Sequence, residues 1–352
     1  MIKNDQQLKK IAKLIDSAQN FLITAHQKPD GDAVGSLLAL YLALTQAGKT
    51  VTPCLADPVP QHLLFLPESG SIISASELAS SKLITHQTAH QAPTLSRDTI
   101  LIVLDCNELQ RTGILPFLPE HLFETAVVLD HHIARSNPLS EFTDIFSKAP
   151  LLYIDTEVFS TAALVYWLLE TMNRPLTPEI ATNIYTGVVT DTGSFCHSNT
   201  NAEALEMAAA LVRAGANPHR ISSQLFQQYP VSRHRLLAMA LNTLELKHEG
   251  RVGFMHVSPD MFIRSGANEE DAHDFVGYIR SIDTVELAVF IKETSNGQSS
   301  VSLRSKSYFN AAELAASFGG GGHFHAAGFR MNKPIAEIKD MLLAKLADVT
   351  WQ

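Results

Sequence analysis

Two uninterrupted apolar runs, each ending in acidic or imidazole side chains, limit what this chain can fold into. Residues 99–105 read TILIVLD, and residues 126–132 read AVVLDHH. A continuous apolar run fits a strand that is covered on both faces, as in a parallel sheet with helices on each side. A third run, FLITA at 21–25, precedes a helical apolar pattern from Val34 to Leu44. These patterns predict an α/β domain with a doubly wound parallel sheet.

The length and composition fit a folded protein with more than one part. The chain has 352 residues, of which 45% are hydrophobic and 18% charged, as expected for one large domain or two ordinary ones. From Arg251 onward, strand patterns and a hairpin signal replace the earlier alternation of strands and helices. We therefore predict a first domain over 1–225, a helical linker over 226–247 and a smaller α/β domain over 248–352.

A cluster of ligand-type side chains stands where the first predicted strand meets its helix. His26, Asp30 and Asp32 lie within seven residues, and Gly31 allows a tight turn between the two carboxylates. Ligands of open α/β sheets bind at this edge, beyond the carboxyl ends of the strands. The segment therefore predicts a metal site. The alternative is a simple helix start, with Asp32 as the N-cap and Asp30 in a turn.

Three further sites with aspartate or histidine side chains follow other strand or helix ends. A doubly wound sheet brings such ends to one edge. The three sites comprise Asp105, Asp130-His131-His132 and Asp191. So many carboxylates close together would repel one another unless cations neutralised them. Mixed imidazole and carboxylate ligands favour Mn²⁺ over Mg²⁺, Fe²⁺ or Zn²⁺, and two ions about 3.5–4 Å apart would activate water for attack on phosphorus.

Each of these residues also has a simpler explanation. Asp105 could cap the next helix, and Asp130 could orient a histidine rather than bind metal. His132 could be packed, hydrogen-bonded or in contact with phosphate, and Asp191 could be a turn residue. The four clusters taken together favour the metal site over these separate explanations.

Charge and cysteine content narrow the range of partners and the compartment. The formal charge of −9 argues against a protein that coats long duplex nucleic acid. Three scattered cysteines without a CxxC pair are typical of reduced thiols, and the amphipathic N-terminus lacks the apolar core of a signal peptide. We therefore expect a cytoplasmic protein without a membrane partner. The sequence does not fix the oligomeric state and leaves a homodimer open.

These motifs, in this order, resemble the four motifs of the DHH phosphoesterases. They are His26-x-x-x-Asp30-Gly31-Asp32, Asp105, Asp130-His131-His132 and Asp191-Thr192-Gly193. The later run Gly319-Gly320-Gly321-Gly322-His323, followed by Ala326-Ala327-Gly328, resembles the associated DHHA1 domain. The two-domain layout is most similar to the nanoRNase/pAp phosphatase group.

The resemblance implies a two-metal, Mn²⁺-dependent phosphohydrolase that acts in the cleft between two lobes. Its ligand sets are His26, Asp30 and Asp105 for one ion, and Asp32, Asp105, His131 and Asp191 for the other. Asp105 would bridge the ions, and His132 would lie near the scissile phosphate. In the second domain, Arg304 would read a phosphate, and Gly320, Gly321, Gly322 and His323 would approach the nucleotide.

The expected substrates are very short oligoribonucleotides and adenosine 3′,5′-bisphosphate (pAp). A phosphodiesterase for cyclic dinucleotides or their linear products is a first alternative. A RecJ-like single-strand exonuclease is a second, although the acidic chain shows no extra nucleic-acid module. A non-catalytic, metal-dependent nucleotide sensor is a third.

Overall fold

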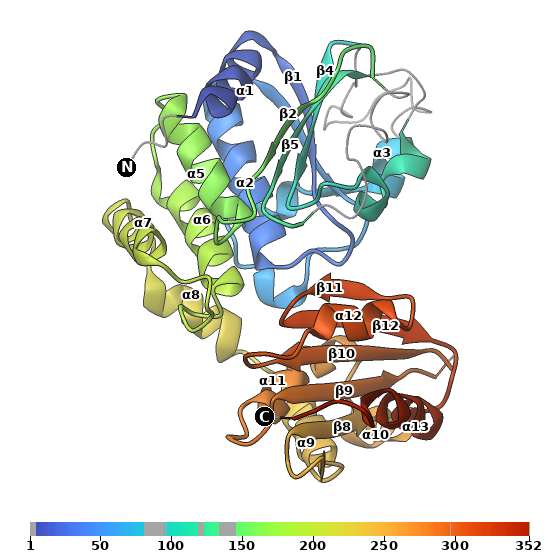
Figure 1. Ribbon diagram of the computed structural model, residues 1–352. Coiled ribbons are helices and arrows are strands. Elements are labelled where there is room, and N and C mark those ends of the chain that lie inside the picture. The colour runs from blue at the N-terminus through green and yellow to red at the C-terminus, as the bar shows by residue number, and fades with distance from the viewer. Residues whose placement is uncertain are drawn as a thin grey trace. The chain divides into compact units, whose positions relative to one another are not determined.

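The computed structural model describes residues 5–80, 95, 97–118, 123–133, 146–295 and 297–351 (Figure 1). Its contacts divide the chain into two units, Met1–Gln228 and Tyr229–Gln352. No helix within the described ranges is both long and apolar enough to cross a bilayer. The three cysteines are free thiols, with Cys54 and Cys106 buried and Cys196 exposed.

The first unit is built on a parallel sheet of six strands. The strands are β1 (Asn20–Thr24), β2 (Thr50–Leu55), β3 (Ile73–Ser74), β4 (Thr99–Leu104), β5 (Phe123–Asp130) and β6 (Leu151–Ile154). Their order is β3-β2-β1-β4-β5-β6, and every neighbouring pair is parallel. The predicted doubly wound sheet is therefore confirmed. The order reverses between β1 and β4, which places the topological switch point there.

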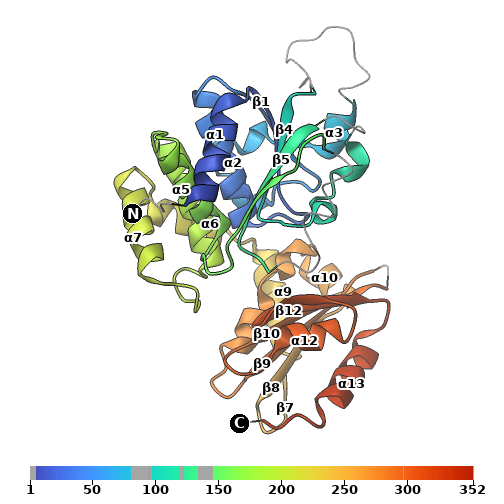
Figure 2. The same cartoon turned by 45° about the horizontal axis from the view of Figure 1, so that its top comes forward.

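Both faces of this sheet are covered, as the continuous apolar runs predicted. Along β4, Ile100 and Ile102 belong to one core cluster, while Leu101 and Val103 belong to another. Alternate side chains of a strand point to opposite faces, so each face has its own core. Figures 1 and 2 show the larger helices on one face and α3 on the other. The helices are α1 (Gln6–Ser17), α2 (Gly31–Gln46), α3 (Ala75–Ser80), α5 (Thr161–Thr171), α6 (Pro178–Asp191), α7 (Ala202–Arg213) and α8 (Pro218–Phe226).

Close packing among α2, α5 and α6 depends on two glycines. A Cβ atom at Gly35 of α2 would lie 2.4 Å from the Asn183 carbonyl oxygen of α6. A Cβ atom at Gly187 of α6 would lie 2.6 Å from the Ala162 Cβ and 2.7 Å from Asp32 Oδ1. All three distances are too short for a side chain, so only glycine allows these helices to approach so closely. This contact brings the amino end of α2 beside α5 and α6.

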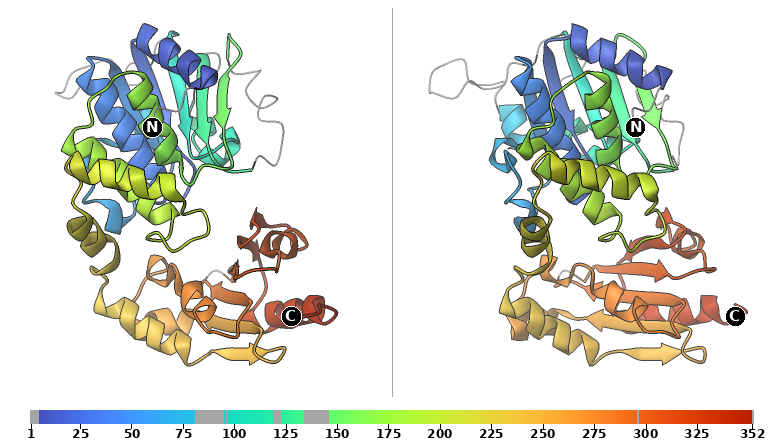
Figure 3. Two further views of the ribbon diagram at one scale, coloured as in Figure 1. Left: turned by 60° about the vertical axis from the view of Figure 1, so that its left-hand side comes forward. Right: turned by 90° about the vertical axis from the view of Figure 1, so that its left-hand side faces the viewer.

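The second unit contains a mixed sheet with helices on both faces (Figure 3). Its strands are β7 (Glu245–Lys247), β8 (Val252–Val257), β9 (Leu287–Glu293), β10 (Ser299–Ser305), β11 (Gly321–His323) and β12 (Ala326–Met331). The order is β11-β12-β10-β9-β8-β7, and only β8 and β9 run parallel. The helices are α9 (Val231–Leu241), α10 (Pro259–Ser265), α11 (Phe275–Arg280), α12 (Ala311–Ala316) and α13 (Ile335–Leu346).

Two segments of the second unit form more regular structure than their sequences suggest. In the segment predicted as a linker, α9 packs into the second unit, since Leu236 and Ala240 are buried in one of its cores. Part of the glycine run forms a strand, because Gly321–His323 pairs with β12. Burial of apolar side chains attaches α9 to the second unit, and backbone pairing with β12 makes Gly321–His323 a strand.

Candidate metal centre

Three neighbouring strands end at one edge of the first sheet and deliver histidines and aspartates there. Asp105 directly follows β4, and His26 follows β1, the adjacent strand. The Nε2 atom of His26 lies 3.3 Å from Asp105 Oδ2. His131 and His132 follow β5, on the other side of β4. The cluster therefore forms at the topological switch point, where open α/β sheets bind ligands.

Two helices contribute the remaining carboxylates through their ends. Asp30 is the N-cap of α2, and its Oδ1 accepts hydrogen bonds from the backbone N–H groups of Asp32 and Ala33 at 3.0 and 3.1 Å. The alternative that Asp32 caps this helix is therefore wrong, since Asp32 lies in the first turn. Asp191 is the last residue of α6. Its position at a helix end places its side chain beside the strand ends.

The structure brings together all seven residues that we predicted around the metal. They form three groups in which one potential ligand atom from each member lies within 4.8 Å of the others. The groups are His26, Asp30 and Asp105; Asp32, His131 and Asp191; and Asp105, His131 and His132. Asp105 and His131 each belong to two groups, so these two side chains join the cluster into one.

Asp105 occupies an unusual backbone position. Its φ angle is 58°, in the left-handed region that few non-glycine residues adopt, and its backbone N–H donates to the Leu129 carbonyl at 3.0 Å. The side chain is buried. Burial raises the pKa of this carboxyl, but the hydrogen bond with His26 and the charges of the neighbouring imidazoles outweigh it, so the pKa is lowered. Asp105 is therefore an ionised carboxylate at the middle of the cluster.

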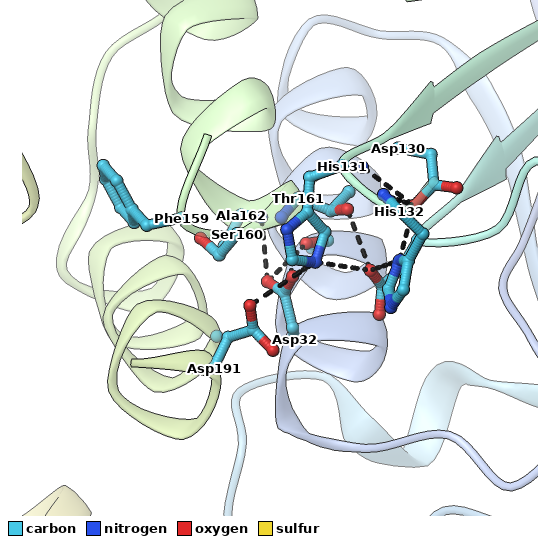
Figure 4. Close-up of polar contacts among 12 residues, drawn as sticks. Asp32, Asp130, His131, His132, Phe159, Ser160, Thr161, Ala162 and Asp191 are labelled. Atoms are coloured by element: carbon cyan, nitrogen blue, oxygen red, sulfur yellow. Dashed lines mark hydrogen bonds and ion pairs between the residues drawn. The ribbon is translucent and has the colours of Figure 1, made fainter. Parts of the chain in front are cut away.

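Asp32 and Asp191 have the opposite tendency. Burial, followed by the charge of Asp105, raises the pKa of both carboxyls well above the usual range. Asp32 nevertheless accepts short hydrogen bonds from the backbone N–H groups of Thr161 (2.6 Å) and Ala162 (2.8 Å) (Figure 4). These donors hold a negative carboxylate in place, while its neighbours disfavour that charge. A bound cation would remove this conflict.

His131 gives the most direct evidence that a cation fits here. Its Nδ1 atom lies 3.2 Å from the Val158 carbonyl oxygen, and burial lowers the pKa of the ring, which favours the neutral imidazole. With the proton on Nδ1, a lone pair remains on Nε2. That atom is buried and has no hydrogen-bond partner among the described residues.

The surroundings of that lone pair are all carboxylate oxygens. The Nε2 atom lies 3.4 Å from Asp191 Oδ2, 3.6 Å from Asp105 Oδ1 and 3.9 Å from Asp32 Oδ2. A lone pair facing three acceptors needs a positive charge between them. Metal-binding histidines commonly donate their other ring nitrogen to a backbone carbonyl, as His131 does. The residues present therefore fit a divalent metal.

Asp130 and Asn107 hold His132. The Oδ1 atom of Asp130 lies 2.8 Å from His132 Nδ1 and accepts from the backbone N–H groups of His131 and His132. Asn107 donates from Nδ2 to Asp130 Oδ2 at 2.5 Å and to the His132 carbonyl at 2.9 Å. Burial lowers the pKa of His132, but Asp130 and Asp105 outweigh it and raise that pKa to about 9.

Asp130 thus lies outside the three ligand groups and orients His132, which is one of the two roles considered for it; the other was direct metal binding. The sequence analysis did not identify Asn107. The signal available for it was a polar residue two positions after Asp105, in the loop at the same sheet edge.

Comparison with known proteins identifies the family. The sequence model of the DHH family, N-terminal domain, matches residues 20–188, and that of the DHHA1 domain matches residues 255–351. A protein of Thermus thermophilus named bifunctional oligoribonuclease and PAP phosphatase NrnA is 32% identical over 325 residues. The match covers 92% of this chain and 88% of the Thermus protein. The chain belongs to the DHH family.

Two further DHH relatives agree with this membership. A Mycoplasma pneumoniae protein, also named bifunctional oligoribonuclease and PAP phosphatase NrnA, is 24% identical, with 89% of this chain and 88% of that protein covered. The crystal structure of an exopolyphosphatase-related protein from Bacteroides fragilis superposes with a TM-score of 0.81 at 25% identity. That match covers 97% of this chain and 96% of the other.

In the DHHA1 domain, Arg304 and the glycine run lie on neighbouring strands. Arg304 of β10 pairs with Ala326 of β12, and Ala326 pairs with His323 of β11, so the three residues form one row across the sheet. Arg304 is partly buried, and its Nη1 atom donates to the Leu303 carbonyl at 3.0 Å. The structure therefore brings Arg304 and the predicted glycine segment together.

Two of these glycines also have a packing role. A Cβ atom at Gly320 would lie 2.2 Å from the Gly328 carbonyl oxygen, and one at Gly322, where φ is +150°, would lie 2.3 Å from the Ala326 carbonyl oxygen. Contact with β12 thus requires glycine at both positions, whatever ligand the strand binds.

Proposed function

We propose that this chain is a metal-dependent phosphohydrolase that cleaves very short oligoribonucleotides and removes a phosphate from pAp. The observation that carries the metal dependence is the buried His131 Nε2 atom, which faces three carboxylates without a hydrogen-bond partner among the described residues. The substrate class is supported by two relatives that are named for both activities and that this chain matches over most of its length.

The proposed ligand sets follow the three groups of the cluster. His26, Asp30 and Asp105, which form one group, would hold one ion. Asp32, His131 and Asp191, which form another, would hold the second ion together with Asp105. Imidazole together with carboxylate suits Mn²⁺ in preference to Mg²⁺. When bound, the ions would supply an activated water and would stabilise negative charge on the phosphoryl oxygens.

The chain's own residues then position the substrate. His132, held by Asp130 and Asn107, presents a ring of fixed orientation beside the cluster. In the DHHA1 domain, Arg304 would bind the phosphate that the reaction leaves intact, because a guanidinium can hold phosphate through two hydrogen bonds. The Gly320–His323 segment would approach the same nucleotide. Chemistry and phosphate recognition are thus assigned to different residues.

A substrate panel tests the proposal. The full chain is freed of metal by chelation and then assayed with and without Mn²⁺ on pAp, dinucleotides, longer oligoribonucleotides and cyclic dinucleotides, with products separated by chromatography. We expect pAp and the shortest oligoribonucleotides to be hydrolysed when Mn²⁺ is present and not when it is absent. Full activity after exhaustive chelation would overturn the metal dependence, and a preference for long strands or cyclic dinucleotides would overturn the substrate assignment.

A further inference from the structure

We propose that the Thr161 hydroxyl is a positioning group for the metal centre, because it fixes the rotation of the Asp105 carboxylate. This inference rests on the proposed metal-dependent function. Thr161 lies outside the DHH motifs that we recognised in the sequence. Its Oγ1 atom donates to Asp105 Oδ1 at 2.9 Å, and both side chains are buried.

The carboxylate of Asp105 has to keep one orientation because its two oxygens face different groups. Oδ2 faces His26, with 3.3 Å to Nε2, whereas Oδ1 faces His131 and His132, with 3.6 and 3.5 Å to their nearest nitrogens. The terminal torsion of aspartate is broad and has no sharp intrinsic minimum. A hydrogen bond to one named oxygen therefore determines which oxygen points to which side.

The hydroxyl is not needed to start the helix. The N-cap of α5 is Ser160, whose side chain accepts from the Ala163 backbone N–H at 3.2 Å. The first turn of α5 uses its backbone N–H groups, from Thr161 and Ala162, to hold Asp32. That leaves the Thr161 hydroxyl for Asp105, so one helical turn fixes a carboxylate from each proposed ligand set.

This arrangement predicts a specific effect on metal binding. Without the hydroxyl, the Asp105 carboxylate can rotate, and the ligand sets that share it no longer form together. Removing a group that orients a metal ligand costs about 10- to 100-fold in metal affinity. We expect a loss of this size for Thr161→Val, which keeps the side-chain shape but lacks the hydroxyl.

The experiment measures Mn²⁺ binding to the chelated full chain by titration calorimetry and by the electron paramagnetic resonance signal of free Mn²⁺. Thr161→Val is compared with Thr161→Ser, which restores the hydroxyl. The matched control is Thr125→Val: Thr125 is also buried, but its hydroxyl donates to the Ala149 carbonyl at 3.0 Å, and it lies five positions before the end of β5. Thermal unfolding of each metal-free variant records stability separately.

Weaker Mn²⁺ binding by Thr161→Val, with near-normal binding by Thr161→Ser and Thr125→Val, would support the proposal. Normal binding by Thr161→Val, or an equal loss in Thr161→Ser, would overturn it. If Thr161→Val does not fold, Thr161→Ala replaces it, since Ala and Ser differ only in the hydroxyl. A wild-type chain that takes up no divalent metal would overturn the proposed function as well, whereas the other contrary outcomes leave that function standing.

Discussion

The candidate metal centre of the first unit and the Arg304 region of the second hold their side chains in different ways. Asp32, Asp105 and Asp130 are buried, and each accepts hydrogen bonds from groups on other parts of the chain. Arg304 is only partly buried, and its one hydrogen bond described here goes to its own neighbour, Leu303. The difference is consistent with the two proposed tasks, because activating a nucleophile requires fixed geometry whereas a charged side chain can adjust to a bound phosphate.

The strongest test of this comparison removes the charge at the middle of the metal centre. In Asp105→Asn, the proposed bridging carboxylate is lost, and we expect kcat to fall at least about 10³-fold, or about 4 kcal/mol in transition-state stabilisation. The metal-free protein should still fold, because this change removes one of several neighbouring carboxylates. Turnover and Mn²⁺ stoichiometry are measured at saturating Mn²⁺. A near wild-type rate would contradict the bridging role.

A smaller loss of activity is expected when only the orientation of the His132 ring is disturbed. Asp130→Asn removes the carboxylate that accepts from Asn107 and contacts His132 Nδ1, and loss of such a supporting group costs about 10- to 100-fold in activity. Mn²⁺ affinity should change less than kcat, since Asp130 is outside the three ligand groups. The two constants are measured on one preparation.

The control for this variant is Asp155→Asn. Asp155 directly follows β6 at the same sheet edge, and its Oδ1 accepts from the Glu157 backbone N–H at 3.2 Å. We expect little change in kcat for this control. An equal fall in kcat in both variants would mean that Asp130 acts only by stabilising this edge of the sheet.

On the other side of the comparison, Arg304→Ala should raise KM rather than lower kcat. A charged hydrogen bond is worth about 1.5–3 kcal/mol, so KM for pAp should rise roughly 10- to 150-fold. The rise should be smaller for a chromogenic monoester, which has no second phosphate. Both constants are measured on both substrates, with Arg330→Ala, an exposed arginine on β12 of the same sheet, as the control.

Two results would contradict this division of roles. An equal loss on pAp and the monoester would show that Arg304 does not read a second phosphate. A change in Mn²⁺ affinity would show that Arg304 affects the metal centre.

The smallest effect on catalysis is expected for Glu286, which supports the chain just after β10. This buried carboxylate accepts from the backbone N–H groups of Ser307, Tyr308 and Phe309 at 2.9–3.0 Å and from the Ser307 hydroxyl at 2.8 Å. Burial raises the pKa of Glu286, but these hydrogen bonds outweigh it and lower the pKa. Because the folded-state pKa lies below the unfolded one, the stabilisation is present above the unfolded pKa of about 4.3 and is lost as pH falls through the folded value.

Glu286→Gln should therefore destabilise the second unit by about 1–3 kcal/mol at pH 7, with the difference shrinking as the pH falls below about 4. Thermal unfolding between pH 3 and 7 measures this, and kcat should change little. A difference that grows on acidification would contradict the assigned pKa direction.

Local patterns were enough to predict much of the fold. The continuous runs at 99–105 and 126–132 became β4 and β5 because strands with cores on both faces need apolar residues at every position. The sheet edge then followed from topology, since parallel strands end on the same side. Ser160 as the cap of α5 was also readable from residue type alone.

Contacts between distant parts of the chain were not predictable in this way. Thr161 bonds Asp105 across 56 positions, and Asn107 bonds Asp130 across 23; nothing next to either residue marks its partner. The need for glycine at 320 and 322 likewise arises from the close approach of β12, which no local pattern shows. The packing of α9 against the second unit likewise depends on a surface formed by later strands.

The left-handed backbone at Asp105 limits the mutational paths open to this chain. Aspartate, asparagine and glycine tolerate that conformation better than other residues do, and only aspartate among them carries a charge. Most replacements at position 105 would combine lost charge with backbone strain, so few substitutions there would leave the fold undisturbed. Asparagine keeps both the conformation and the shape, so among changes at this position Asp105→Asn is the one by which a descendant could most easily lose the proposed metal sites and keep the fold.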